Sequence, residues 1–307
     1  MKILLTGSNG FIGGEIQKYF GKNITYLLNK FDDKLMLSNN LDRQYIFSPL
    51  DSIESWIPND IDIVLNFGAI TDTLSKNKKN FNDFNYIFTI NLIKYCAKKN
   101  IFLIHASSAS VYGNNKVMNE NQKLNYPINL YAKSKLMIDQ NITDLYSLNF
   151  PIISLRLFNI YGSTELKKGS MASIIWRFSN DILEKKYCSI FTIEEKLIGS
   201  QSRDFVYVQD LCRIIEYVTQ HPKNYGIINF GTGISTQFRS IATQIFEFAR
   251  VPKNIKYIEM PTDFFQHYQW YTASDRAKFN KYFPHFEFTS ISHGIQSVLF
   301  DLKKVND

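Results

Sequence analysis

The sequence predicts an α/β protein in which a doubly wound parallel sheet is joined to a smaller, interleaved lobe. Short apolar segments alternate with amphipathic ones through the first half of the 307-residue chain. A strand–helix rhythm of this kind is typical of a parallel sheet with helices on both faces. A composition of 45% hydrophobic and 21% charged residues is also that of a globular protein with a sizeable core.

The first half of the chain contains five clear strand candidates separated by helix candidates. Strands are expected at residues 2–6, 24–28, 61–67, 101–107 and 152–157. Helices are expected at residues 11–20, 85–99 and 131–148. Strands that are each followed by a helix pair in parallel, so the carboxyl ends of these strands should meet at one edge.

The rhythm changes after about Gly162. A helix is expected near 171–184, and strands at 205–208 and 227–230, of which the second should return to the main sheet. We therefore predict a main domain of residues 1–161 plus about 204–234, and a smaller lobe of residues 162–203 and 235–307. No Pro/Gly/Ser-rich linker separates the two.

Charge and hydropathy exclude several classes of protein. The chain has 35 Lys+Arg against 28 Asp+Glu, a net charge of +7, but no block of five like charges. Lysines such as Lys76, Lys78 and Lys79 are therefore interpreted as a solvated face, and nucleic acid is not an expected partner. No apolar run is long enough for a membrane span or a signal peptide, so no membrane association is expected.

Cysteine and histidine usage gives no sign of a disulfide framework or a metal site. Cys96, Cys188 and Cys212 are far apart, odd in number and form no CxxC pair. This pattern favours a reducing compartment, and we expect the cytoplasm. The five histidines lack metal-ligand spacing, and His105 lies in an apolar run typical of a packed core. No metal is predicted.

A glycine-rich turn follows the first strand. Gly7, Gly10 and Gly13 recur at three-residue spacing between that strand and the first helix. Glycines there let the backbone approach a pyrophosphate, which the N–H groups and positive dipole end of the helix then attract. In this position the motif predicts a Rossmann-type domain that binds a dinucleotide, NAD or NADP.

The residues after the second strand bear on the choice of cofactor. An acid there would bind the adenosine ribose hydroxyls, but the sequence has Asn29. Lys30 could meet a 2′-phosphate, which leans slightly toward NADP, or could be an exposed lysine. Asp51, after the third strand, could meet the adenine or cap a helix. These alternatives stay open.

A candidate acid–base set follows the strand at 101–107. Tyr131 and Lys135 are four residues apart, on one face of a helix. A lysine ammonium near the phenol favours phenolate, and a tyrosine tuned in this way can take a proton from a sugar hydroxyl. Ser108 lies at a strand's carboxyl end, where its hydroxyl can bond the reacting oxygen. Ser108, Tyr131 and Lys135 are therefore the expected catalytic residues.

Together these motifs resemble the extended short-chain dehydrogenases that act on nucleotide sugars. The glycine turn, the segment 107–113 (SSASVYG) and the Tyr-x-x-x-Lys pair occur in that family's order, and the resemblance covers nearly the whole chain. It implies that Asn85 lies at the cofactor, that Asn159 of segment 156–162 (RLFNIYG) faces the nucleotide diphosphate, and that Arg203 binds the pyrophosphate. The cofactor-binding set implied is Gly7, Asn9, Gly10, Phe11, Ile12, Gly13, Asn29, Lys30, Asp51, Gly68, Asn85, Tyr131 and Lys135.

A narrower resemblance is to the ADP-glycero-manno-heptose 6-epimerase family. It is carried by segments 168–173 (KGSMAS), 203–208 and 229–233 (NFGTG), and by residues near Tyr268. The resemblance implies that Lys168 is a second acid/base, which serves the opposite face of a transient ketone. It also implies that Ser170, Tyr268 and Tyr271 join Asn159 and Arg203 in binding a nucleotide-diphosphate sugar, that the cofactor is tightly retained, and that the protein is a homo-oligomer.

Two alternatives remain beside a heptose epimerase. Sugar dehydratases of this group carry Thr-Asp-Glu after the catalytic strand, and the epimerase-reductases that make GDP-fucose have a cysteine where Ala109 stands, so both are disfavoured. A nucleotide-sugar 4-dehydrogenase or 4-keto reductase would look similar. A non-catalytic dinucleotide-binding regulator would have no use for Ser108, Tyr131 and Lys135. The nucleotide base, the reacting carbon and the number of subunits are left open.

Overall fold

A computed structural model describes most of the chain. The described residues are 1–31, 34–39, 44–121, 123, 125–144, 150–192, 201–261 and 268–306. The chain divides into two compact units that alternate along it: unit 1 is Met1–Gly113, Glu120–Leu157 and Leu211–Asn229, and unit 2 is Asn114–Asn119, Phe158–Asp210 and Phe230–Asp307. Four stretches expected in the main domain belong instead to unit 2, namely residues 114–119, 158–161, 204–210 and 230–234. Which ligand each unit binds stays a prediction.

Unit 1 is built on an eight-stranded sheet with the order β11-β7-β6-β5-β1-β2-β3-β4. The strands are β1 (Ile3–Thr6), β2 (Ile24–Phe31), β3 (Lys34–Asn39), β4 (Gln44–Phe47), β5 (Ile63–Asn66), β6 (Phe102–Ser108), β7 (Ile152–Leu157) and β11 (Asn224–Phe230). The pairings β1–β2, β1–β5, β5–β6 and β6–β7 are all parallel. Because the chain moves from β1 to β2 on one side and later to β5 on the other, a ligand crevice is expected at the carboxyl ends of β1 and β5.

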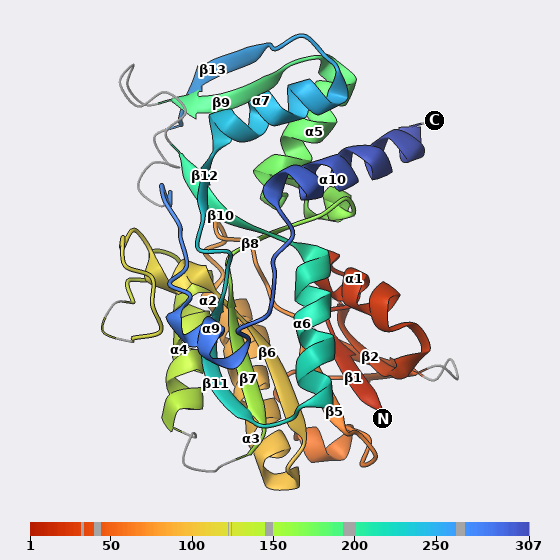
Figure 1. The fold of residues 1–307 in the computed structure, drawn as a ribbon. Helices are drawn as coiled ribbons and strands as arrows, with labels where there is room; N and C mark the ends of the chain where they lie inside the picture. The colour runs from red at the N-terminus through yellow and green to blue at the C-terminus, as the bar shows by residue number, and fades with distance from the viewer. Residues whose placement is uncertain are drawn as a thin grey trace. The chain divides into compact units, whose positions relative to one another are not determined.

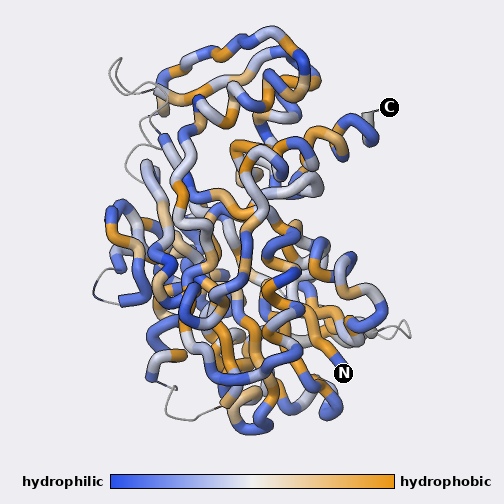
Figure 2. Tube along the Cα trace, in the orientation of Figure 1, coloured by the Kyte–Doolittle hydropathy of each residue, from blue (hydrophilic) through white to orange (hydrophobic). Residues whose placement is uncertain are grey.

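Helices cover both faces of this sheet (Figure 1). α3 (Phe88–Lys99) and α4 (Leu130–Asp144) pack on one face, while α1 (Phe11–Phe20) and α6 (Val208–Gln220) lie along the other. The core between the strands and the α3–α4 layer includes Leu4, Val64, Leu92, Leu103 and Ile138, all fully buried. Figure 2 shows hydrophobic residues concentrated along the strands, as a sheet covered on both faces requires. The predicted doubly wound α/β class is confirmed.

The sheet departs from the expected pattern at one edge. β3 pairs antiparallel with β2, and β4 pairs antiparallel with β3. The segment that precedes Asp51 therefore contributes two strands, of which β4 is the last, and no helix crosses between β2 and β3. The predicted strand near Ile227 does return to the main sheet, where β11 lies beside β7.

Two helices begin later than the sequence pattern indicates. α3 begins at Phe88, because Phe81–Ile87 forms a π-helical segment, not the start of an α-helix. α5 begins at Ile174, because the hydroxyl of Ser173 accepts a hydrogen bond from the Trp176 N–H (3.2 Å) and caps the helix there. The last residues of the predicted helix at 131–148 lie outside the described residues.

Unit 2 combines small sheets with three packed helices. A three-stranded sheet has the order β12-β10-β8 and a two-stranded sheet the order β13-β9. The elements are β8 (Asn159–Tyr161), α5 (Ile174–Lys185), β9 (Cys188–Thr192), β10 (Ser202–Tyr207), β12 (Ser235–Gln237), α7 (Phe238–Ala249), β13 (Ile255–Glu259), α9 (Ala277–Tyr282) and α10 (Ile291–Asn306). Ile175, Ile182, Ile241, Ile245 and Ile295 from α5, α7 and α10 form a fully buried cluster. Within the described residues, no helix is long and apolar enough to cross a membrane.

Candidate active site

The glycine turn of unit 1 is too tight for any other residue. Gly7 has a φ of +77°, and a Cβ there would lie 2.6 Å from the Cα of Gly68. A Cβ on Gly13 would lie 2.1 Å from the carbonyl oxygen of Gly7. These contacts bring the ends of β1 and β5 together at the N-terminus of α1, where Phe11, Ile12 and Gly13 form the first helical turn. The predicted dinucleotide-binding turn therefore has the geometry that a pyrophosphate requires.

Asn29 braces this turn. Its side chain is 6% exposed, its Oδ1 accepts a hydrogen bond from the Asn9 N–H (3.0 Å), and its Nδ2 donates to the Ser8 hydroxyl (2.8 Å). An aspartate could accept from Asn9 but could not donate to Ser8 as an amide does. The sequence interpretation treated Asn29 as a replacement for a ribose-binding acid and missed this bracing contact.

Lys30 and Asp51 are placed differently. The Lys30 ammonium lies 5.0 Å from the ring centroid of Phe84, a cation–π distance. Asp51 is exposed, and its carboxylate accepts a hydrogen bond from the Ser48 N–H (2.7 Å) across a turn. Asp51 thus stabilises a turn, and a contact of either residue with a cofactor stays a prediction.

Gly68 and Asn85 fix the loop after β5. The Gly68 N–H donates to the Thr6 hydroxyl (2.7 Å), which ties this loop to the end of β1. Asn85 is 1% exposed; it accepts from the N–H of Ile70 (2.8 Å) and donates to its carbonyl (2.9 Å). Asn85 also donates to the Ser134 hydroxyl (3.1 Å), so it joins the loop to α4. The structural role of Asn85 is to brace this loop, and its contact with the cofactor stays a prediction.

The three predicted catalytic residues of unit 1 come together at the carboxyl end of β6. Tyr131 and Lys135 lie one turn apart on α4, and the Lys135 ammonium is 5.9 Å from the centroid of the Tyr131 ring. The Ser108 hydroxyl is hydrogen-bonded to the Tyr131 phenol, a bond that works against the rise that burial causes in the pKa of Tyr131. Ser108 also accepts a hydrogen bond from the Ser110 N–H (3.2 Å) and so caps the turn that follows.

Lys135 is the buried charge of the set. Its side chain is 3% exposed, and its ammonium donates to the carbonyl oxygen of Ala106 (2.6 Å). Burial lowers the pKa of Lys135 to about 8, and the nearby charge of Asp139 works in the opposite direction. An ammonium held under a phenol stabilises phenolate, so the arrangement can accept a proton at Tyr131.

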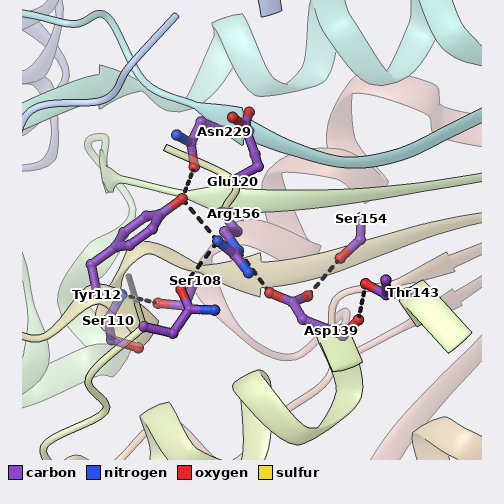
Figure 3. Close-up of polar contacts among 10 residues, drawn as sticks. Ser108, Ser110, Tyr112, Glu120, Asp139, Thr143, Ser154, Arg156 and Asn229 are labelled. Atoms are coloured by element: carbon purple, nitrogen blue, oxygen red, sulfur yellow. Dashed lines mark hydrogen bonds and ion pairs between the residues drawn. The ribbon is translucent and has the colours of Figure 1, made fainter. Parts of the chain in front are cut away.

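A buried polar network lies behind these residues (Figure 3). Arg156 on β7 and Asp139 on α4 form an ion pair of 2.7 Å between side chains that are both 0% exposed. The Arg156 guanidinium also donates to the phenol of Tyr112 (2.9 Å), which in turn donates to Asn229 (2.6 Å). The sequence interpretation missed Asp139, although its position four residues after Lys135 indicates that the two side chains share one face of the helix.

Unit 2 presents a buried arginine. Arg203 is 8% exposed and lies 5.2 Å and 5.7 Å from the ring centroids of Tyr268 and Phe238. Burial lowers the pKa of Arg203 to about 10, and within the described residues no carboxylate opposes that effect. Burial raises the pKa of Tyr268, while Arg203 lowers it. A buried guanidinium stacked on rings, with no carboxylate counter-charge among those residues, is suited to a phosphate ligand.

The other predicted substrate-binding residues of unit 2 differ in exposure. Asn159 is half-buried and donates to the Asp204 carbonyl (3.0 Å) and the Thr272 hydroxyl (3.0 Å). Tyr271 is 41% exposed and forms an isolated bridge with Ser202, so it lies beside β10, the strand that carries Arg203. Ser170 is exposed. Their contacts with a substrate stay predictions.

Lys168 is held by a buried glutamate that the sequence interpretation missed. The Lys168 ammonium is 29% exposed and lies 2.7 Å from Glu165, which is 0% exposed. Glu165 also accepts hydrogen bonds from the N–H of Gly162 (3.1 Å) and from both the N–H (2.7 Å) and hydroxyl (2.6 Å) of Ser173. The carboxylate thus fixes the whole segment that carries Lys168. Its position three residues before Lys168, on the same helical face, was the available signal.

The glycine turn fits an organic cofactor. The glycine turn, the N-terminus of α1 and the loop at Gly68 form a cradle that a side chain at Gly7 or Gly13 would fill, which fits a nicotinamide dinucleotide. Within the described part of the chain, no group of three or more His, Cys, Asp or Glu side chains could hold a metal ion.

Comparisons with known proteins point in the same direction. Residues 3–231 match the NAD dependent epimerase/dehydratase family. The chain is 32% identical over 322 residues to an ADP-L-glycero-D-manno-heptose-6-epimerase of Brachyspira hyodysenteriae, with 98% of each chain covered. The ADP-L-glycero-D-manno-heptose-6-epimerase of Helicobacter pylori has a similar structure, with a TM-score of 0.78 at 23% identity over 98% of this chain and 96% of that one. UDP-glucose 4-epimerase of Thermus thermophilus, solved with NAD, has a TM-score of 0.76 at 17% identity over 99% of each chain.

Proposed function

Because the chain belongs to the NAD dependent epimerase/dehydratase family, we propose that it inverts one carbon of a nucleotide-diphospho-manno-heptose by transient oxidation and re-reduction. The observation that carries the heptose assignment is the 32% identity to a heptose 6-epimerase along 98% of both chains. The presence of Lys168 on a segment fixed by Glu165 supports it, since inversion needs a second proton-transfer group.

Tyr131 is the group that removes the first proton. A nicotinamide cofactor bound at the glycine turn would supply the acceptor for a hydride from the sugar carbon and its donor on return. As the hydride leaves, the Tyr131 phenolate takes the proton of the hydroxyl on that carbon, with Ser108 hydrogen-bonded to the reacting oxygen. Lys135 holds positive charge beneath the phenol, which favours phenolate before the transfer. The carbon becomes a ketone, with its hydride on the cofactor and its hydroxyl proton on Tyr131.

Lys168 is the second proton-transfer group in this proposal. Inversion requires the hydride to return to the opposite face of the ketone, where the new oxygen anion needs a proton from a different donor. The ammonium of Lys168 can supply that proton, and its ion pair with Glu165 (2.7 Å) fixes its position. Arg203 would bind the diphosphate through its planar fork.

The comparisons support a nicotinamide dinucleotide but not the preference for NADP that the sequence suggested. The family description and the solved Thermus thermophilus relative both name NAD. The slight lean to NADP that came from Lys30 finds no support in these comparisons. We propose a nicotinamide dinucleotide retained through the catalytic cycle, and expect a cytoplasmic homo-oligomer.

A substrate panel tests the assignment. The purified protein is incubated with ADP- and GDP-linked manno-heptoses and with UDP-glucose, and each product is identified by proton NMR, with Tyr131→Phe as the control. Inversion at C6 of a heptose, absent in Tyr131→Phe, is the expected result. Accumulation of a 4-keto sugar would instead favour the 4-dehydrogenase or 4-keto reductase, and binding without turnover of any sugar would favour a regulator.

A further inference from the structure

We propose that Asp139 is a positioning residue for the catalytic lysine of this protein, Lys135, and that Arg156 is its anchor. Figure 3 shows the contact between Asp139 and Arg156. The inference rests on the proposed function, because it takes Tyr131 and Lys135 as the acid–base pair. It assigns a role to the buried ion pair that the mechanism above leaves unused.

Helical spacing brings Asp139 close to Lys135. Asp139 lies four residues after Lys135 on α4, so the two side chains project from the same face with Cβ atoms about 5–6 Å apart. Asp139 is 0% exposed and Lys135 is 3% exposed. Little water screens the attraction of the carboxylate for the ammonium, and the Arg156 cation 2.7 Å from that carboxylate opposes part of it.

Lys135 needs a counter-charge. Burial favours neutral lysine and lowers the pKa of Lys135 to about 8, while the charge of Asp139 raises it. The other titratable or charged groups around the lysine offer no negative charge near neutral pH. His105 on β6 has a pKa lowered well below its usual value by burial, the pKa of Tyr131 is raised by burial, and Arg156 on β7 is a cation. Asp139 therefore keeps Lys135 in the charged form that Tyr131 requires.

Arg156 and Ser154 hold Asp139 in place. The Arg156 Nε donates to one carboxylate oxygen of Asp139 (2.7 Å), and the Ser154 hydroxyl donates to the other (3.2 Å). The guanidinium supplies the counter-charge without which burial of a carboxylate is costly. Arg156 also donates to Tyr112 (2.9 Å), the last residue of the 3₁₀ turn that begins after Ser108. One arginine thus joins the helix of Tyr131 and Lys135 to the turn that follows Ser108.

The test measures the titration of Lys135 directly. The protein, with its nicotinamide cofactor bound, is labelled with ¹³C at lysine, and the Cε resonance of Lys135 is followed from pH 6 to 10 after assignment with Lys135→Met. Asp139→Asn removes the negative charge while preserving shape. We expect the midpoint to move toward acid by about one to two pH units, the size of an attraction between buried charges at this spacing. Ile138→Val, which trims a fully buried neighbour on α4 without changing charge, should leave the midpoint in place.

A second variant covers the case in which Asp139→Asn is too unstable to purify, since it leaves Arg156 as a lone buried charge. In Asp139→Asn/Arg156→Met neither charge remains, and the midpoint should still fall, but by less than in Asp139→Asn, because loss of the Arg156 cation also removes a repulsion from Lys135. A midpoint unchanged from the wild type in whichever variant folds would overturn the proposal and leave the ion pair a purely structural role. The titration needs no sugar, so failure of the proposed function would appear in the substrate panel and not here.

Discussion

Replacing Lys168 by methionine separates inversion from oxidation. The substitution removes the group proposed to protonate the new hydroxyl and leaves Ser108, Tyr131 and Lys135 unchanged. Inversion at C6 should therefore fall, while abstraction of hydride from the first face continues. Reduced cofactor and keto sugar should then build up on the protein in proportion to the inversion that is lost.

The structure sets the size of both expected effects. Loss of a positioned acid or base lowers a rate roughly 10²–10⁴-fold. The stability cost should be about 1–3 kcal/mol, because Glu165 is 0% exposed and loses its counter-charge. Glu165 would still accept hydrogen bonds from Gly162 and from both groups of Ser173, so the segment should keep its conformation.

The assay is a proton NMR time course at C6, run beside thermal unfolding of each variant. Lys167→Met is the matched control, since it removes the neighbouring exposed lysine and should keep wild-type activity. Full epimerase activity in Lys168→Met, or an equal loss in Lys167→Met, would refute the assignment of Lys168.

Three further predictions follow from particular contacts. In Gly13→Ala the new Cβ would lie 2.1 Å from the Gly7 carbonyl oxygen. The purified variant should therefore retain much less nucleotide than the wild type, as measured after acid release. A normal nucleotide content would contradict the assignment of the cofactor site. Burial holds the pKa of Lys135 at about 8, so the folded protein has lost this proton between about pH 8 and 10.4 while the unfolded chain still binds it. The free energy of unfolding of the wild type should therefore rise with pH in that window. Its slope should exceed that of Lys135→Met by up to about 1.4 kcal/mol per pH unit, and equal slopes of the two proteins in denaturant titrations would contradict the lowered pKa of Lys135. Arg203→Met should weaken binding of a nucleoside diphosphate about 10–100-fold, the value of a charge-assisted contact of about 1.5–3 kcal/mol, and unchanged affinity by calorimetry would remove Arg203 from the phosphate site.

The sequence predicted the parts of the site that depend on local geometry. Gly7 and Gly13 are informative because only a turn between strand and helix needs such spacing. Tyr131 and Lys135 are informative because four residues bring side chains to one helical face. Ser108 followed from the rule that parallel strands open their carboxyl ends onto the ligand.

The rest depended on partners that are distant in the sequence. Asn29 was interpreted through the ribose that an acid would bind, whereas its contacts are with Ser8 and Asn9, about twenty residues earlier. Arg156 has its partner Asp139 on a different element, so no periodicity reveals the pair. The antiparallel pairing of β3 with β2, which are neighbours in the sequence, was missed for a different reason: an apolar segment does not indicate the direction in which it will pair.

The central claim is an inversion that consumes no cofactor. The most direct measurement follows C6 of the manno-heptose by NMR in protein to which no cofactor has been added, while the absorbance of reduced nicotinamide is recorded in parallel. We predict complete inversion over many turnovers with no lasting change in absorbance. Reduced cofactor that accumulates in proportion to a keto sugar would contradict the claim and make the protein a dehydrogenase.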